Sequence, residues 1–280
     1  MLHHTAQGPS GPLSGNQGPS GPLSGNQGPS GPLGGTRIVL VHGFTQTGRS
    51  WDHVAEPLRD RGFEVVRVDL PGHGGSSDVR LCFTDTALAI GEVGGTGCYV
   101  GYSMGGRLCL RLAIERPDLV RSLVLVGASP GLADPAERAE RRQSDARLAT
   151  DIEGDGTVGF LERWLAQPLF ETTTPRDEDL AARRANPPRG LAYALRELGT
   201  GNQEPLWDRL GELGKLGIPT LLIVGEADAK FRAIAQRMAD AMSPPPRVEV
   251  VAGAGHAVPL DQPEACTRLI AEAARHAVIR

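Results

Sequence analysis

The stretch Gly101-Tyr102-Ser103-Met104-Gly105 is the most informative part of this 280-residue chain. It follows an apolar run at residues 98–100 and precedes a helical pattern over residues 104–116. A serine between two glycines at such a junction is typical of a sharp strand-to-helix turn that exposes the serine at the edge of a sheet. Glycine is expected at the flanking positions because a side chain would clash there. The free N–H groups at the start of the helix can stabilise developing negative charge.

Two polar residues nearer the C-terminus could complete a catalytic set with Ser103. Asp228 follows a strand predicted over residues 219–225, and His256 follows a strand predicted over residues 248–251. Open α/β sheets place their sites at the carboxyl ends of strands, where these residues would meet. His256 would take the serine proton, and Asp228 would hold the imidazole tautomer and stabilise its charged form. Taken separately, Asp228 is a helix N-cap and His256 a loop histidine, and both alternatives stay open here.

A loop after an earlier strand points to the same edge of the sheet. An apolar strand is predicted over residues 38–41, and His42-Gly43-Phe44 follows it. The chain order serine, acid, histidine resembles that of the α/β-hydrolases, in which this loop and the residue after the nucleophile each supply one oxyanion N–H. The resemblance implies that Phe44 and Met104 form the oxyanion hole. We interpret His42, and His73 in the turn Asp69-Leu70-Pro71-Gly72-His73-Gly74, as structural.

Composition allows one sizeable core and argues against several functions. Hydrophobic residues make up 40% of the chain, and its net charge of −4 carries no nucleic-acid signature. No segment has transmembrane length, and no basic-then-apolar signal opens the chain. The four cysteines show neither paired nor metal-ligand spacing, which favours reduced thiols in a cytoplasmic protein. We expect no cofactor, metal, nucleic acid or membrane segment, and the sequence does not indicate an oligomeric state.

The N-terminal region has a different composition from the rest. The sequence QGPSGPLSGN occupies residues 7–16 and recurs at residues 17–26. A tract with so few apolar residues cannot bury a core. We therefore predict that residues 1–35 are a short N-terminal segment and a repeat linker, mostly disordered. A short edge strand at residues 1–6, with the repeat as an expanded loop, is an open alternative.

From residue 36 onward, strand and helix patterns alternate along most of the chain. This alternation predicts an α/β fold, the α/β-hydrolase fold, with a mostly parallel sheet covered by helices on both faces. Residues 36–129 and 206–280 would form the two parts of the core. Residues 130–205 show helical stretches without a convincing strand, as expected of an inserted helical cap. In the core, a helix is predicted over residues 51–61, with Ser50 as its N-cap.

Arginines dominate the predicted cap and bear on the choice of substrate. They are Arg138, Arg141, Arg142, Arg147, Arg163, Arg176, Arg183, Arg184, Arg189 and Arg196. A guanidinium binds carboxylates bidentately, whereas a cap for apolar acyl chains would present leucine and phenylalanine. Arg107 lies one helical turn after Ser103 and is the strongest candidate for contact with a substrate. More than half of the cap arginines would instead be solvated and paired with glutamates such as Glu137 and Glu140.

Longer stretches resemble the MenH family, the 2-succinyl-6-hydroxy-2,4-cyclohexadiene-1-carboxylate synthases of menaquinone biosynthesis. They include His42-Gly43-Phe44-Thr45, Gly101-Tyr102-Ser103-Met104-Gly105-Gly106-Arg107, Glu137-Arg138-Ala139-Glu140-Arg141-Arg142-Gln143-Ser144-Asp145, Gly225-Glu226-Ala227-Asp228-Ala229-Lys230-Phe231 and Gly255-His256. The resemblance covers residue 36 to the end of the chain. The serine turn is generic to the superfamily, whereas the cap stretches and the one that contains Lys230 are specific. The N-terminal repeat departs from the family pattern.

This resemblance implies an elimination. Family members release pyruvate from 2-succinyl-5-enolpyruvyl-6-hydroxy-3-cyclohexene-1-carboxylate after the triad serine has abstracted a proton. The implied partner is a small polycarboxylate, bound by residues drawn from Arg107, Arg142, Arg141, Arg183, Arg184 and Tyr102. Spacing does not separate the adjacent arginines of each pair. Trp164 and Tyr193 are either pocket walls or plain packing residues.

Two other functions fit the same residues. The first is a carboxylic ester or thioester hydrolase with an acyl-enzyme on Ser103, because a fold does not settle the chemistry. The second is a ligand-binding module that retains the triad without catalysis. Ser103→Ala would separate an enzyme from a binding module. Arg107→Ala would separate the lyase from a hydrolase of small neutral esters.

Overall fold

A computed structural model describes residues 1–10 and 36–276 of the chain. The repeat tract over residues 11–35 lies outside the described part. The sequence pattern also predicts a final helix over residues 263–278, and its last two residues lie outside the described part as well.

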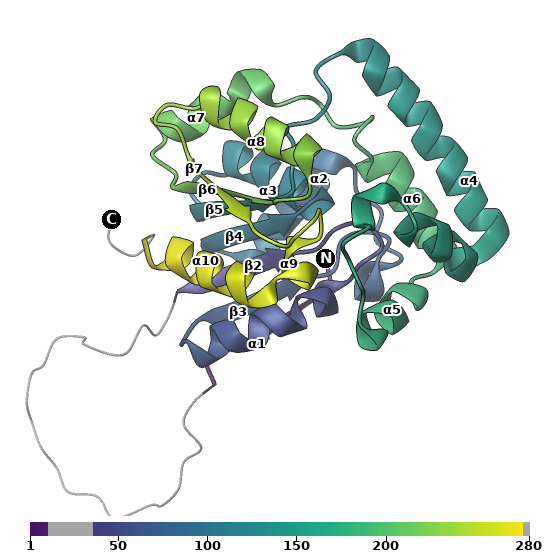
Figure 1. Cartoon of the computed structure of the whole chain (residues 1–280), viewed down its shortest axis with the longest axis horizontal. Helices are drawn as coiled ribbons and strands as arrows, with labels where there is room; N and C mark the ends of the chain where they lie inside the picture. Colours follow the sequence, from purple (N-terminus) through teal and green to yellow (C-terminus); the bar gives the residue numbers. More distant parts are fainter. Residues whose placement is uncertain (11–35, 277–280) are drawn as a thin grey trace, which may run out of the picture.

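A mostly parallel sheet forms the centre of the described structure (Figure 1). Its strands are β1 His4–Gln7, β2 Arg37–Val41, β3 Glu64–Val68, β4 Gly97–Tyr102, β5 Val120–Val126, β6 Thr220–Gly225 and β7 Arg247–Val251. They lie in the order β1-β3-β2-β4-β5-β6-β7, and β1 alone among them runs antiparallel to its neighbour. The predicted α/β-hydrolase sheet is thereby confirmed.

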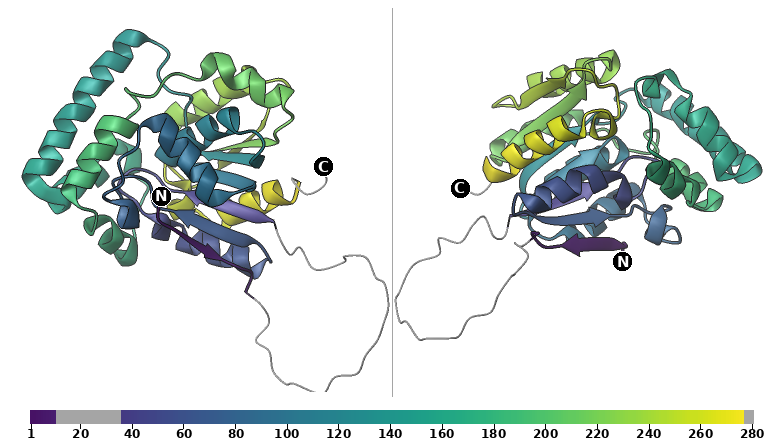
Figure 2. Two further views of the ribbon diagram at one scale, coloured as in Figure 1. Left: turned by 180° about the vertical axis from the view of Figure 1, so that it is seen from behind. Right: turned by 60° about the horizontal axis from the view of Figure 1, so that its bottom comes forward.

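Helices cover both faces of this sheet (Figure 2). They are α1 Asp52–Asp60, α2 Phe83–Gly94, α3 Met104–Glu115, α4 Pro135–Leu165, α5 Asp177–Arg184, α6 Pro188–Leu198, α7 Leu210–Lys215, α8 Ala229–Asp240, α9 Val258–Asp261 and α10 Pro263–His276. Short 3-10 helices occupy Gly48–Trp51, Gly74–Ser76, Pro168–Phe170 and Trp207–Arg209. Helices α1 and α10 pack on one face with one apolar cluster, and α2, α3 and α8 pack on the other with a second. All six residues of β4 are buried, as expected for a central strand covered on both sides.

The chain begins as an edge strand. β1 pairs with β3, Leu2 is only 2% exposed, and His3 Nδ1 lies 2.9 Å from Asp69 Oδ2. Apolar burial of Leu2 and the pairing of β1 explain why residues before the repeat are ordered. The edge-strand alternative is therefore confirmed in place of a disordered start at residues 1–6, and the strand extends to Gln7.

The turn between β4 and α3 needs both of its flanking glycines. A Cβ at Gly101 would lie 2.4 Å from the carbonyl oxygen of Gly105. A Cβ at Gly105 would lie 2.3 Å from the carbonyl oxygen of Val41 in β2. These contacts confirm the expected clash, and the second one shows that the helix start is pressed against the neighbouring strand.

Helices α4, α5 and α6 lie between β5 and β6 in sequence, to one side of the sheet (Figures 1 and 2). Contacts between α4 and α6 bury Ile152, Phe160 and Leu191 in a separate small core. The predicted N-cap role of Ser50 is wrong. Its hydroxyl donates to Asp179 Oδ1 at 2.6 Å in α5, so this serine joins the core to the helical insertion.

Candidate active site

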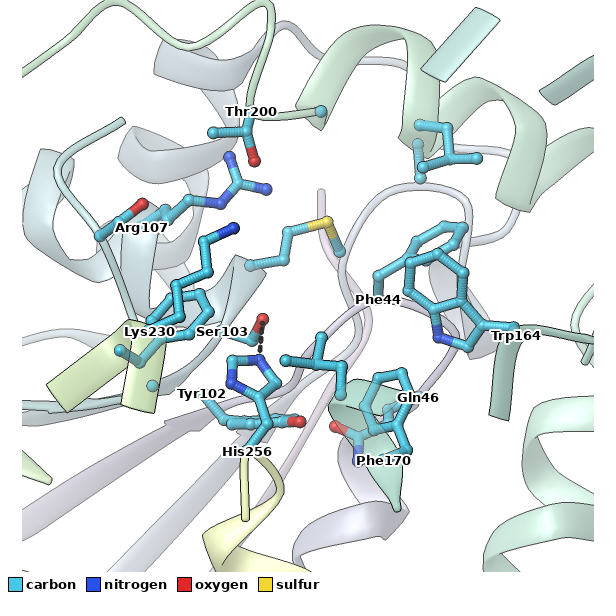
Figure 3. Close-up of a pocket in the computed structure, with 18 of the residues that line it drawn as sticks. Phe44, Gln46, Tyr102, Ser103, Arg107, Trp164, Phe170, Thr200, Lys230 and His256 are labelled. Carbon is cyan, nitrogen blue, oxygen red and sulfur yellow. Dashed lines mark hydrogen bonds between the residues drawn. The ribbon is translucent and has the colours of Figure 1, made fainter. Parts of the chain in front are cut away.

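Three strand ends bring Ser103, His256 and Asp228 together. His256 Nε2 lies 3.1 Å from Ser103 Oγ, and His256 Nδ1 lies 2.8 Å from Asp228 Oδ2 (Figure 3 shows the serine contact). An ionised carboxylate only accepts hydrogen bonds, so Nδ1–H donates to Asp228 and Nε2 accepts from the serine hydroxyl. This arrangement can draw the proton from Ser103 and hold the resulting imidazolium.

Asp228 has two hydrogen-bond partners, one for each of the roles that the sequence left open. Oδ2 faces His256, while Oδ1 accepts from the backbone N–H of Phe231 at 3.1 Å and caps α8. The cap fixes the rotamer of the carboxylate and leaves its second oxygen free for the imidazole. Asp228 is therefore an N-cap and the partner of the histidine at once.

Strained backbone occurs at the serine itself and in the loop that follows β2. Among described residues other than glycine, only Ser103, with φ 51°, and Thr45, with φ 69°, have positive φ. Such conformations cost about 1–3 kcal/mol each and gather at functional sites. Met104 begins α3, so its N–H has no partner within the helix, and Phe44 immediately precedes Thr45. Both Phe44 and Met104 line the cavity around Ser103.

The cavity above Ser103 has two contrasting sides. Arg107 and Lys230 point in from one side, and Phe44, Trp164 and Phe170 stand on the other (Figure 3). The indole nitrogen of Trp164 is buried and has no hydrogen-bond partner within the part of the chain that the structure describes. A ligand with anionic groups at one end and an apolar body would match this division.

Arg107 lines the cavity as a buried cation held by neutral groups. Nη1 donates to Gln203 Oε1 at 3.0 Å, and Nη2 donates to the carbonyl of Leu198 at 2.8 Å. Burial and, to a lesser extent, the nearby Arg141 lower the pKa of Arg107 to about 9, and Asp145 partly offsets both. A guanidinium in this setting favours an anionic ligand, because a counter-charge would offset its loss of hydration.

The structure separates the adjacent cap arginines. Arg141 and Arg183 line the cavity, whereas Arg142 and Arg184 are exposed and do not. Arg142 instead donates to the carbonyl of Gly201 at 2.9 Å. Arg142 and Arg184 are thus wrong as pocket residues in this structure.

Arg141 and Arg183, the two cap arginines that line the cavity, already have acidic partners. Arg141 Nε donates to Asp145 Oδ1 at 2.8 Å, and burial raises the pKa of that acid. Arg183 Nε donates to Asp179 Oδ2 at 2.7 Å. Each guanidinium is thereby oriented by a carboxylate of its own helix.

Other sequence interpretations need revision. The ion pairs found for Arg141, Arg163 and Arg196 involve Asp145, Asp155 and Glu153, not Glu137 or Glu140. Tyr193 donates to the carbonyl of Leu81 and carries Arg80 over its ring, away from the cavity. Tyr102 does line the cavity and packs against the His256 ring at 5.4 Å between centroids, and burial raises its pKa.

Several site residues escaped the sequence analysis. Lys230 follows Asp228 by two positions and is exposed at the cavity, and its presence in a family-specific stretch was an available signal. Gln203 orients Arg107, although its position in the chain gave no local sign of that contact. Phe170 faces the His256 ring from a 3-10 helix of the insertion.

The two histidines interpreted as structural are buried in the loops under the site. His42 Nε2 accepts from the N–H of Leu70, and His73 Nε2 accepts from the N–H of Thr45 at 3.2 Å. Burial lowers the pKa of both histidines, and burial together with the nearby His42 lowers that of His73 to about 3. Both are therefore neutral at pH 7 and serve as hydrogen-bond acceptors.

Within residues 1–10 and 36–276, no group of three or more His, Cys, Asp or Glu side chains is placed to hold a metal ion. In the same ranges no helix has the length and apolar character needed to cross a membrane. All four cysteines are free, with Cys82 exposed and Cys98, Cys109 and Cys266 buried.

Comparison with known proteins places the chain in a family. Residues 38–269 match the model of the alpha/beta hydrolase family. The chain is therefore an enzyme of the α/β-hydrolase family.

Relatives within that family narrow the assignment. A Bacillus subtilis (strain 168) protein, provisionally named a 2-succinyl-6-hydroxy-2,4-cyclohexadiene-1-carboxylate synthase, is 35% identical over 84% of this chain and 89% of its own. The synthase of that name from Salmonella agona (strain SL483) is 31% identical, over 85% and 93% of the two chains. The chain belongs to the MenH family within the α/β-hydrolases.

Solved structures agree with this assignment. MenH from S. aureus superposes with a TM-score of 0.83 at 26% identity, over 99% of this chain and 100% of that one. A thermophilic esterase from Thermogutta terrifontis, solved with malate bound, has a TM-score of 0.70 at 26% identity, over 87% and 91%.

Proposed function

We propose that the chain is a 2-succinyl-6-hydroxy-2,4-cyclohexadiene-1-carboxylate synthase of menaquinone biosynthesis. It would eliminate pyruvate from 2-succinyl-5-enolpyruvyl-6-hydroxy-3-cyclohexene-1-carboxylate. The observation that carries this proposal is the buried Arg107 guanidinium, which lines the cavity of Ser103 yet has only neutral hydrogen-bond partners among the residues that the structure describes. The names of the relatives support it.

The chemistry follows from the two ring systems. The substrate has one ring double bond at C3, and the product has two, at C2 and C4, so the proton that leaves is the one on C2. That C–H bond is acidic because it is adjacent to the succinyl ketone. Its electron pair forms the C2–C3 double bond, the C3–C4 pair shifts to C4–C5, and the C5–O bond breaks. The enolpyruvate that leaves takes up a proton and becomes pyruvate.

In this proposal Ser103 Oγ takes the C2 proton while His256 accepts the serine proton. Asp228 stabilises the imidazolium through the Nδ1 contact of 2.8 Å. The ketone oxygen gains negative charge as C2 loses its proton. The N–H groups of Phe44 and Met104 would stabilise that enolate oxygen as an oxyanion hole does.

Carboxylate recognition falls to the cationic side of the cavity. We assign Arg107 and Arg141 to substrate carboxylates, with Lys230 as a further cation at the same side. A bidentate guanidinium fixes the orientation of a carboxylate as well as its position. Phe44 and Trp164 would pack against the ring, with Tyr102 supporting His256 from beneath.

A carboxylic ester or thioester hydrolase is the second candidate. The Ser103–His256 contact of 3.1 Å suits an acyl-enzyme equally well. The esterase from Thermogutta terrifontis shows that a protein of similar fold is named for that activity and was solved with a dicarboxylate bound.

The test is an assay with freshly prepared substrate. Pyruvate release and the ultraviolet absorbance of the conjugated diene are followed with wild type, Ser103→Ala and no enzyme, because the substrate decays by itself. Fast release that disappears in the variant supports the lyase. No acceleration over the background contradicts it and directs the work to ester and thioester substrates.

A further inference from the structure

We infer that Asn186 is a positioning residue that couples the helical insertion to the oxyanion hole through Thr45. The inference rests on the proposed role of the Phe44 N–H in stabilising an oxyanion. It assigns to the insertion a second task besides substrate recognition, namely holding the loop that carries this N–H in its strained shape.

Every polar group of Thr45 has a partner. Its N–H donates to His73 Nε2 at 3.2 Å, its carbonyl accepts from Asn186 Nδ2 at 2.8 Å, and its hydroxyl accepts from Arg183 Nη1 at 2.7 Å. Thr45 is fully buried and has a φ of 69°. Two of its three partners come from the insertion, so the loop beside Phe44 is shaped largely by residues far away in sequence.

Asn186 is well placed to hold the Thr45 backbone in this conformation. Its side-chain amide makes two hydrogen bonds: Nδ2 donates to the carbonyl of Thr45, and Oδ1 accepts from the N–H of Gly74 at 2.8 Å. Its own carbonyl accepts from the hydroxyl of Thr157 in α4 at 2.7 Å. Asn186 is only 2% exposed, so water cannot replace these bonds at low cost.

A change in the Thr45 backbone would affect the oxyanion hole through the peptide that joins Phe44 to Thr45. Phe44 and Thr45 are adjacent, so rotation of the Thr45 backbone toward an unstrained conformation would also turn the Phe44 backbone. Strained backbone persists only where its surroundings over-determine it. Without the Asn186 donor, the Thr45 carbonyl would be buried and unpaired. This loss would favour rotation of the Thr45 backbone away from its native conformation.

The test uses a reaction that needs the oxyanion hole but not the proposed substrate. Paraoxon phosphorylates an activated serine, and its transition state places negative charge on the phosphoryl oxygen. The rate of Ser103 labelling is measured by intact mass for wild type, Asn186→Ala, Asn186→Asp and Asn186→Ser. Ser103→Ala provides the unlabelled reference.

We expect Asn186→Ala and Asn186→Asp to label about tenfold to a hundredfold more slowly, the size of effect that a misplaced group of about 1 Å produces. Asn186→Asp keeps an acceptor for Gly74 but loses the donor to Thr45. Loss in that variant therefore reports the Thr45 bond specifically. In the elimination assay the same variants should lower kcat with little change in KM.

Asn202→Ala is the matched control, because Asn202 is an exposed asparagine of the same region whose amide bonds to the carbonyl of Arg196. It should label at the wild-type rate. Thermal unfolding shows whether each variant is folded at the assay temperature.

Wild-type labelling by folded Asn186→Asp and Asn186→Ser would overturn the inference. If the Asn186 variants label slowly but the wild-type protein releases no pyruvate, the positioning role of Asn186 is supported and the proposed function is rejected. The two failures are thus separable.

Discussion

The ends of the central strands and the helical insertion contribute to one cavity in different ways. Ser103, Asp228 and His256 follow β4, β6 and β7, and the parallel sheet alone brings their side chains together. In the insertion, Arg141 faces the cavity while its neighbour Arg142 faces away. The topology of the sheet brings the three side chains together, whereas the angle at which the helices of the insertion dock decides which of their side chains line the cavity.

The largest expected effect on activity comes from a substitution at Asp228, which follows β6 of the sheet. Asp228→Asn keeps an oxygen that can cap α8 but offers an N–H₂ group to His256, which favours the wrong imidazole tautomer. We expect kcat to fall about 10⁴-fold, as for the equivalent change in a serine protease triad. The free energy of unfolding in urea should change little.

Asp228→Ala separates the two tasks of this residue. It should lose activity similarly but also lose about 1 kcal/mol of stability, because the helix cap disappears. Equal unfolding midpoints for the Asn and Ala variants would show that the contact with Phe231 contributes no stability.

The next effect concerns the boundary between sheet and insertion. Arg107→Ala should lower kcat/KM for the elimination at least tenfold, roughly 1.4 kcal/mol, because a substrate carboxylate loses its buried cation. Hydrolysis of a small neutral ester, where measurable, should be nearly unchanged. A smaller loss in the elimination assay would remove Arg107 from carboxylate binding.

The adjacent arginines of α4 provide a sharper comparison within the insertion. Arg141→Ala should raise KM for the elimination about tenfold, the effect of losing one carboxylate contact. Arg142→Ala should change it less than about twofold, because that side chain is exposed. Equal effects on KM would mean that α4 docks at a different angle when substrate is bound.

The smallest effect is on stability against pH. Burial lowers the pKa of His42 and His73, so the unfolded chain binds protons below about pH 6.5 that the native chain does not. The contribution of His73 is therefore full above that pH and falls as the pH drops toward 3, by on the order of 1 kcal/mol per pH unit, and His42 changes stability in the same direction.

Urea unfolding at pH 7, 6 and 5 measures this slope. His73→Gln should flatten it relative to the wild type. A slope that is the same in both proteins would contradict the assignment of His73 as a buried neutral acceptor.

Local patterns predicted most of the core. β6 at Thr220–Gly225 agrees to within one residue with the strand predicted over residues 219–225, and the Ser103 turn lies where its glycines indicated. These features depend on periodicity and on steric demands within a few residues. The ordered edge strand β1 depends instead on Leu2 reaching a distant cluster, and the sequence left it as an alternative.

Contacts across long stretches of sequence could not be predicted. Ser50 resembles a helix cap in its local sequence, yet its hydroxyl bonds to Asp179 in the insertion. Asn186 and Gln203 have no local motif, and their importance lies in partners more than ninety residues away. In the same way, the choice between Arg141 and Arg142 requires the docking of α4, which no spacing rule supplies.

The most direct measurement uses substrate with deuterium in place of the C2 proton. We expect slower enzymatic release of pyruvate from the deuterated substrate at limiting concentration, and no covalent mass on Ser103 by intact mass spectrometry during turnover. Equal rates for the two substrates, together with an acyl-enzyme mass on Ser103, would contradict an elimination and establish hydrolytic chemistry in this cavity.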